Sequence, residues 1–242
     1  MPSNLSQKQI VLTGATDGIG LATAWKLEEC GANVLAVGRR TPDTVALPPK
    51  AHYLQVDLSD ADAHEAVTRH LANTGWTEVH HLIHNAGLGY VGPIERQTAD
   101  DLDDLITVNL TAPIALTTAL FPHLERAGGS VCFVGSTIAN RTTPNFAAYS
   151  ATKTALSDLA QNLDTEWRGK VRVQEVNPGP TRTNFHAKAG FENPPLASLF
   201  MTQEEVADGI IKCLETGARI KNYGMISLAV HAIRRRLRRH QP

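Results

Sequence analysis

The stretch Thr13-Gly14-Ala15-Thr16-Asp17-Gly18-Ile19-Gly20 decides the fold of this 242-residue chain. It continues the apolar run Ile10–Thr13, which predicts a β-strand, and it opens the run Gly18–Glu29, which predicts a helix. Glycines in a strand-to-helix turn let the backbone approach a phosphate, and the free N–H groups of the helix start attract its charge. The turn therefore predicts a dinucleotide site, with Asp17 as the helix cap, formed by Gly14, Thr16, Asp17, Gly18, Ile19 and Gly20.

Beyond this turn, short apolar runs alternate with segments of helical periodicity. Further strands are expected at Asn33–Val37, His52–Val56, His80–His84, Ser130–Gly135, Val171–Val176 and Tyr223–Leu228. Further helices are expected at Ala61–Leu71, Asp100–Arg126, Ala147–Trp167 and Thr202–Thr216, with Pro113 and Pro122 bending or ending parts of the second. This alternation predicts a single-domain α/β fold over residues 1–228, a doubly wound, mostly seven-stranded parallel sheet (Rossmann fold).

The composition is that of an ordinary globular protein. Apolar residues make up 42% of the chain and charged residues 19%, with a formal net charge of -1, so we expect no nucleic acid partner. Cys30, Cys132 and Cys213 lack the spacing of a metal site, and no metal is expected. Residues 1–8 lack the apolar core of a signal peptide, and no apolar run approaches the length of a membrane span. These features predict a cytoplasmic protein.

Two segments depart from the regular alternation. Residues 184–201 form a long loop, and long loops in compact domains often cover a substrate. Residues 229–242 form a basic tail that contains Arg234, Arg235, Arg236, Arg238 and Arg239. One interpretation is that the tail makes peripheral contact with an anionic membrane, an acyl carrier protein or nucleic acid. The other, which we favour, is a solvated chain end.

The end of the second predicted strand indicates which dinucleotide binds. In Rossmann folds an acid near this point binds the ribose 2′-hydroxyl of NAD, whereas an arginine accommodates the 2′-phosphate of NADP. Here Gly38 stands in the place of the acid, and Arg39 and Arg40 follow it. An arginine binds a phosphate through two parallel hydrogen bonds. We therefore expect NADP(H), with NAD(H) as the alternative.

A tyrosine and a lysine stand four residues apart on one predicted helix, at Tyr149 and Lys153. Residues at this spacing lie on the same helical face. A free tyrosine has a pKa of about 10, and a nearby ammonium favours the phenolate. The pair therefore predicts a tyrosine whose pKa is lowered toward the range in which general acid–base catalysis is efficient.

With its Thr13-Gly14-x-x-x-Gly18-x-Gly20 turn, Asn85-Ala86-Gly87 motif and Tyr149-x-x-x-Lys153 pair, the chain resembles the short-chain dehydrogenase/reductase (SDR) family in its single-domain branch. The resemblance implies a catalytic tetrad of Asn109, Ser136, Tyr149 and Lys153. In this tetrad the tyrosine is the acid or base, the serine binds the substrate oxygen, and the asparagine holds a water linked to the lysine. The lysine also binds the nicotinamide ribose.

The resemblance also implies the remaining cofactor contacts. Asp57 and Leu58 would lie at the adenine, and Asn85, Ala86 and Gly87 beside the cofactor. Pro178, Gly179, Thr181 and Thr183 would lie along the nicotinamide. It further implies a homodimer or homotetramer.

The leading hypothesis is therefore an NADP(H)-dependent oxidoreductase that transfers a hydride between nicotinamide and a carbonyl or secondary alcohol. Its substrate is expected to be hydrophobic, because the predicted pocket wall is mainly apolar: Leu88, Tyr90, Ile138, Phe146, Phe185, Phe191, Leu196, Leu199 and Phe200. One alternative is a 3-ketoacyl reductase linked to acyl carrier protein. Another, of a different class, is a non-catalytic NADP(H)-sensing protein.

Overall fold

A computed structural model describes residues 3–185, 189 and 200–222. The strands are β1 (Gln9–Thr13), β2 (Asn33–Gly38), β3 (His52–Gln55), β4 (His81–His84), β5 (Ser130–Val134), β6 (Arg172–Asn177) and β7 (Ile220–Asn222). The helices are α1 (Gly18–Glu29), α2 (Ala63–Thr74), α3 (Ala99–Ile106), the π-helical turn η3 (Thr107–Thr111), α4 (Ala112–Ala127), α5 (Ala147–Glu166) and α7 (Gln203–Thr216). Short 3-10 turns, η1 and η2, lie at Pro42–Thr44 and Ile94–Arg96.

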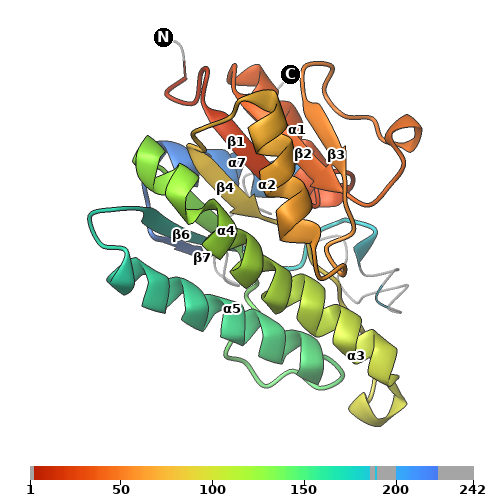
Figure 1. The fold of residues 1–242 in the computed structure, drawn as a ribbon. Helices are drawn as coiled ribbons and strands as arrows, with labels where there is room; N and C mark the ends of the chain where they lie inside the picture. The colour runs from red at the N-terminus through yellow and green to blue at the C-terminus, as the bar shows by residue number, and fades with distance from the viewer. Residues whose placement is uncertain (1–2, 186–188, 190–199, 223–242) are drawn as a thin grey trace, which may run out of the picture.

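The strands form one parallel sheet in the order β3-β2-β1-β4-β5-β6-β7 (Figure 1). The chain winds outward from β1 in one direction through β2 and β3, and then returns to the other side of β1 at β4. This confirms the predicted doubly wound α/β fold. Ligands of such sheets bind where the winding reverses, outside the carboxyl ends of the strands. The reversal between β1 and β4 therefore positions the site.

Two apolar cores cover the two faces of the sheet. Residues of α1 and α7, among them Leu27 and Ile210, pack on one face. Residues of α2, α4 and α5, among them Leu71, Leu120 and Leu156, pack on the other. Figure 1 shows α2, α4 and α5 in front of the sheet and α7 behind it. The strands read as nearly continuous apolar runs because both of their faces are buried.

The helix that follows β4 differs from its prediction. Neither Pro113 nor Pro122 ends it: α3, η3 and α4 run on from Ala99 to Ala127, and Pro122 lies inside α4. The irregularity is the π-helical turn η3. Pro113 has no N–H to donate to the carbonyl of Asn109, four residues earlier. The π-helical turn, which is wider than an α-helical turn, contains Asn109 and thus lies where this hydrogen bond is missing. Asn109 is thereby placed within a local widening of the helix.

The same run, Ala99–Ala127, is long and apolar enough to span a membrane on length and composition alone. Our expectation that no apolar run approaches this length was therefore wrong. The apolar residues Leu116, Leu120 and Leu124 are fully buried against the sheet. In this structure the segment is a core helix.

Near the end of the described chain, α7 begins as predicted. The Thr202 hydroxyl accepts from the Glu205 N–H, and the Glu205 carboxylate accepts from the Thr202 N–H. This capping box fixes the helix start. The predicted strand Tyr223–Leu228 and the basic tail 229–242 lie outside the described residues, and β7 lies just before them.

Two buried histidines on β4 are neutral. His84 shares a hydrogen bond of 2.7 Å with the Thr117 hydroxyl and stacks on Phe133. His81 shares a hydrogen bond of 2.8 Å with Ser130. Burial lowers the pKa of each imidazole from 6.5 to about 3, with nearby cations adding to the effect at His81. Both are structural residues of the core.

The two histidines make stability depend on pH. Below pH 6.5 the unfolded chain binds their protons, while the folded protein stays unprotonated until about pH 3. The stabilising contribution is thus complete above pH 6.5 and is lost as pH falls, by about 2 kcal/mol per histidine at pH 5. Urea unfolding between pH 5 and 8 checks this. In His84→Gln, the number of protons taken up on unfolding should fall by about one, so the free energy of unfolding should depend less on pH. Parallel curves for the two proteins would contradict the assignment.

Candidate functional site

A cavity of about 750 Å³ opens at the carboxyl ends of the central strands. Its wall contains most of the expected cofactor residues: Gly14, Thr16, Asp17, Gly18, Ile19, Arg39, Arg40, Asp57, Leu58, Asn85, Ala86, Gly87, Pro178, Gly179, Thr181 and Thr183. Ser136, Tyr149 and Lys153 of the expected tetrad line it as well. Gly20 and Asn109 are not part of this wall.

The glycine turn is packed too closely for side chains. Gly14 has a φ of +64°, and a Cβ there would lie 2.7 Å from the Cα of Ala86. A Cβ on Gly20 would lie only 2.0 Å from the carbonyl oxygen of Gly14. Asp17 caps α1 as predicted, its carboxylate accepting from the Gly18 N–H at 2.8 Å. The turn thus presents bare backbone and a helix start, which fits a pyrophosphate.

Asn85 holds this turn to the neighbouring strand. Its Nδ2 donates to the carbonyl oxygens of Thr13 at 3.1 Å and of Gly14 at 3.0 Å. In return, the Thr13 hydroxyl accepts from the N–H groups of Asn85 and Ala86. These bonds clamp β1 to β4 where the winding reverses. Thr13, known from the sequence as the strand end that opens the glycine motif, is thus a positioning residue.

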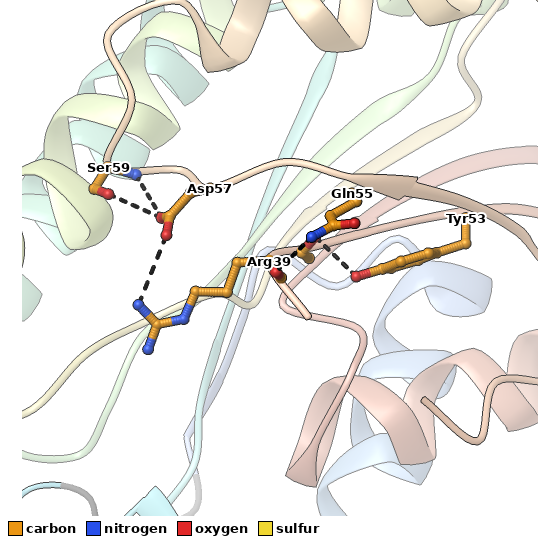
Figure 2. Close-up of polar contacts among 6 residues, drawn as sticks. Arg39, Tyr53, Gln55, Asp57 and Ser59 are labelled. Atoms are coloured by element: carbon orange, nitrogen blue, oxygen red, sulfur yellow. Dashed lines mark hydrogen bonds and ion pairs between the residues drawn. The ribbon is translucent and has the colours of Figure 1, made fainter. Parts of the chain in front are cut away.

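Both arginines after β2 reach the cavity, and both are paired with carboxylates. Arg40 forms an ion pair of 3.1 Å with Asp17, the cap of α1. Arg39 reaches Asp57 at 3.8 Å, and Asp57 also accepts from the N–H and hydroxyl of Ser59 (Figure 2). The side chains of Arg40 and Arg39 are 40% and 61% exposed, so both remain accessible from the cavity.

Two residues of β3 fix the backbone that carries these arginines. The Tyr53 hydroxyl lies 2.9 Å from the carbonyl oxygen of Gly38 and 2.5 Å from that of Arg40. Gln55 Nε2 donates to the Arg39 carbonyl at 3.2 Å (Figure 2). Sequence reasoning missed Tyr53 and Gln55. Their alternate spacing on a predicted strand was the available signal, because it places both side chains on one face of the sheet.

The π-helical turn aims Asn109 at the loop after β4. Its Oδ1 accepts from the Leu88 N–H at 2.8 Å, and its Nδ2 donates to the Leu88 carbonyl at 2.9 Å and to Thr152 at 3.1 Å. A Cβ on Gly87 would lie 3.3 Å from Asn109 Oδ1 and 3.5 Å from Lys153 Nζ. Asn109 thus joins the loop to α5 and lies near the lysine.

Tyr149 and Lys153 lie on the buried face of α5, as their spacing predicted. Lys153 Nζ donates to the Val134 carbonyl at 3.0 Å and lies 5.9 Å from the centre of the Tyr149 ring. Burial lowers the pKa of Lys153 to about 8, against the opposing effect of the Glu175 carboxylate.

The predicted lowering of the Tyr149 pKa is not found. Burial raises this pKa to about 12, although a hydrogen bond with Ser136 opposes the change. The residue is 9% exposed, and the removal of water from the phenolate outweighs the hydrogen bond with Ser136. In this structure the tyrosine is therefore a protonated phenol at neutral pH.

The model of the short chain dehydrogenase family matches residues 8–193. This chain belongs to the short-chain dehydrogenase/reductase family. It is 30% identical over 197 residues to the uncharacterized oxidoreductase YciK of Escherichia coli K12, a match that covers 76% of this chain and 78% of YciK. The chain is accordingly an oxidoreductase of the SDR family.

Two solved SDR structures have the same fold. One is a short-chain dehydrogenase from Sphingobium yanoikuyae in complex with NADPH, with a TM-score of 0.78, 25% identity, and coverage of 97% of this chain and 96% of that chain. The other is a 3-ketoacyl-(acyl-carrier-protein) reductase from Brucella melitensis complexed with NADH, with a TM-score of 0.81, 25% identity, and coverage of 90% and 97%.

One part of the cavity wall, next to Tyr149, is mainly apolar. Of the predicted wall, Leu88, Ile138, Phe146, Phe185 and Phe200 line it, whereas Phe191, Leu196 and Leu199 lie outside the described residues. The Phe185 ring lies 5.4 Å from that of Tyr149.

Tyr90 was predicted wrongly to line this part of the cavity. Its hydroxyl bonds Asp101, which together with burial raises its pKa, and it is absent from the wall. Sequence reasoning also missed Arg141, an exposed cation that lines the cavity beside the apolar residues. Among the described side chains, no cluster of histidine, cysteine, aspartate and glutamate is suited to a metal ion.

Proposed function

We propose that this SDR enzyme transfers a hydride between NADP(H) and the carbonyl or secondary alcohol of a hydrophobic compound. One observation carries the proposal. Ser136, Tyr149 and Lys153 line the same cavity as Arg39 and Arg40, and an apolar wall adjoins the tyrosine. One cavity is thus lined by the groups that would transfer the proton, by the arginines that would bind a phosphate and by an apolar wall for the substrate.

The described residues fit a nicotinamide dinucleotide. The bare backbone at Gly14 and the start of α1 suit the pyrophosphate, and Asp57 and Leu58 line the cavity where they would contact the adenine. Pro178, Gly179, Thr181 and Thr183 line the opposite end, next to Tyr149. When bound, the nicotinamide supplies the hydride for reduction or accepts it in oxidation.

The protein's own part in the reaction is to hold the substrate oxygen and to move a proton. The Ser136 and Tyr149 hydroxyls are hydrogen-bonded to each other and would both donate to a carbonyl oxygen. A phenol with a pKa of about 12 holds its proton at neutral pH and is ready to donate it. Lys153, which donates to the Val134 carbonyl and lies near Asn109, would resupply that proton. This protonation state favours carbonyl reduction.

Gly38 supports the preference for NADP(H). A Cβ on this residue would lie 2.5 Å from Cγ2 of Thr16, so an acid of the kind that binds the NAD ribose would require Thr16 to move. The two arginines instead place positive charge at this end of the cavity.

Removing the charges of Arg39 and Arg40 should weaken NADPH binding selectively. We expect Arg39→Ala and Arg40→Ala each to raise the Kd for NADPH about 10- to 100-fold, because a hydrogen bond to a charged group contributes about 1.5–3 kcal/mol. The Kd for NADH should change less than about threefold, since NADH lacks the 2′-phosphate. Fluorescence titration with both nucleotides measures this. Arg69→Ala removes an exposed arginine of α2 and is the matched control.

The proposed function is tested by NADPH oxidation against a panel of ketones and aldehydes, with NADH in parallel. We expect turnover that prefers NADPH and apolar substrates. A preference for NADH would contradict the cofactor assignment. NADPH binding without turnover of any panel member would favour the sensing alternative.

A second candidate is a 3-ketoacyl reductase linked to acyl carrier protein. The similarity in fold to the Brucella melitensis enzyme favours it, as does the basic tail, which would suit an acidic carrier. Including a carrier-bound and a free 3-ketoacyl thioester in the panel separates the two candidates. We further propose a homodimer or homotetramer in the cytoplasm; peripheral membrane contact through the tail is the alternative.

A further inference from the structure

A buried carboxylate lies beneath the proposed active site. Glu175, on β6, is only 2% exposed, and among the described residues its Oε1 has no hydrogen-bond partner. Neither the proposed reaction nor cofactor binding has used it. A buried carboxylate is costly unless a nearby charge or hydrogen bonds compensate for the loss of water. A cation nearby would compensate for this cost.

The carboxylate of Glu175 lies close to Gly135, the residue that follows β5. Glu175 pairs in register with Phe133 of β5, and Val176 pairs with Val134. A Cβ on Gly135 would lie 3.0 Å from Glu175 Oε1. Gly135 itself lines the cavity. The carboxylate and the cavity are thus both adjacent to Gly135.

The Lys153 ammonium reaches the same backbone segment from α5. It is 4% exposed and donates to the carbonyl of Val134, the residue before Gly135. The negative charge of Glu175 opposes the effect of burial, which lowers the pKa of Lys153. Among the described residues it is the one charge with this effect on the lysine.

The other titratable groups around Glu175 are neutral in the structure. From α5, burial keeps the Tyr149 phenol protonated. From β5, a hydrogen bond with Cys213 of α7, together with burial, raises the pKa of the Cys132 thiol. From β4, His84 lies beyond Phe133 and is a neutral imidazole. Among the described side chains, Lys153 is thus the cation coupled to the charge of Glu175; Arg219, whose carbonyl accepts from the Glu175 N–H, forms an ion pair with Asp164 instead.

We propose that Glu175 is a positioning residue that acts through Lys153, its buried carboxylate holding the lysine as an ammonium beside Tyr149. This rests on the proposed function, in which Lys153 resupplies the proton of Tyr149. A neutral lysine would have no proton to pass on. The carboxylate thereby sets the upper pH limit of the proton path, although it touches neither substrate nor cofactor.

The direct test is the titration of Lys153 by NMR in protein labelled with [13Cε]lysine, with the signal assigned from Lys153→Met. In Glu175→Gln, which keeps the shape but removes the charge, we expect the midpoint to fall by about 1 pH unit. Glu175→Asp keeps the charge and should titrate near the wild type. Glu166→Gln removes an exposed carboxylate of α5 and is the matched control for net charge.

The same variants are compared in the pH profile of kcat/KM for carbonyl reduction. The alkaline limb of Glu175→Gln should move to lower pH by the same amount, with about a tenfold loss at pH 9 and little change at pH 6. An unchanged Lys153 midpoint would overturn the proposal, as would an equal loss of activity at every pH. If the protein reduces no carbonyl, the proposed function fails, yet the NMR titration still decides the role of Glu175.

Discussion

Tyr149→Phe is expected to lower kcat for carbonyl reduction by about 10³-fold, with the Kd for NADPH changed less than about twofold. The phenol is the proton donor of the proposed reaction, and phenylalanine fills the same space beside Phe185 without a proton to give. General acid–base catalysis contributes typically about 10²- to 10⁴-fold. The Ser136 hydroxyl stays in place and still holds the substrate oxygen, so a residual rate is expected. Steady-state kinetics and fluorescence titration measure the two quantities.

Tyr90→Phe is the matched control for this substitution. It also removes one hydroxyl, but that hydroxyl bonds Asp101 outside the cavity wall. We expect its kcat to stay within about twofold of the wild type, since surface substitutions rarely disturb a distant site. If Tyr149→Phe retained more than about a tenth of the wild-type rate, Tyr149 would not be the general acid.

Gly20→Ala is expected to destabilise the folded protein by about 3 kcal/mol and to weaken NADPH binding at least about tenfold. Its Cβ would lie 2.0 Å from the Gly14 carbonyl oxygen and 2.4 Å from Asn85 Nδ2. The first is a backbone atom and the second is held by hydrogen bonds to Thr13 and Gly14, so the turn and the clamp from β4 must both move. The free energy of unfolding in urea and the Kd for NADPH measure the two effects.

Gly75→Ala separates this clash from backbone strain. Gly75 ends α2 with a φ of +73°, and a Cβ there would meet nothing within 4 Å. Alanine at this position should lower the free energy of unfolding by about 1 kcal/mol, because only the left-handed backbone conformation is unfavourable for it. The Kd for NADPH should stay unchanged. Equal losses of stability in the two variants would mean that the close packing at Gly20 is unimportant.

The local parts of the fold and of the site could be predicted from sequence. The bounds Gly18–Glu29 of α1 and the start of α7 at Thr202, its N-cap, were correct. Such features depend on neighbouring residues, whose identity the sequence displays directly. The glycine turn was predictable because a strand precedes it and a helix follows it.

The errors concern interactions between distant segments. The high pKa of Tyr149 follows from burial by several elements, which a spacing of four residues does not reveal. The pairing of Arg40 with Asp17 joins segments that are 23 positions apart. The proline rule indicated an irregularity at Pro113, where η3 lies just before it, but it did not predict that the helix continues through both prolines. Charge, burial and packing at these points exist only once the sheet has formed.

The π-helical turn at Thr107–Thr111 has a consequence for how the chain tolerates deletions. A π-helical turn contains one residue more than an α-helical turn closed at the same place. Deleting one residue would restore a regular helix, yet it would rotate α3 relative to α4 by about 100°. The buried Leu105 and the hydrogen bonds of Asn109 would then lose their common orientation. A shorter helix would be more regular and more stable by itself, so at this one position helix regularity and the geometry of the site oppose each other.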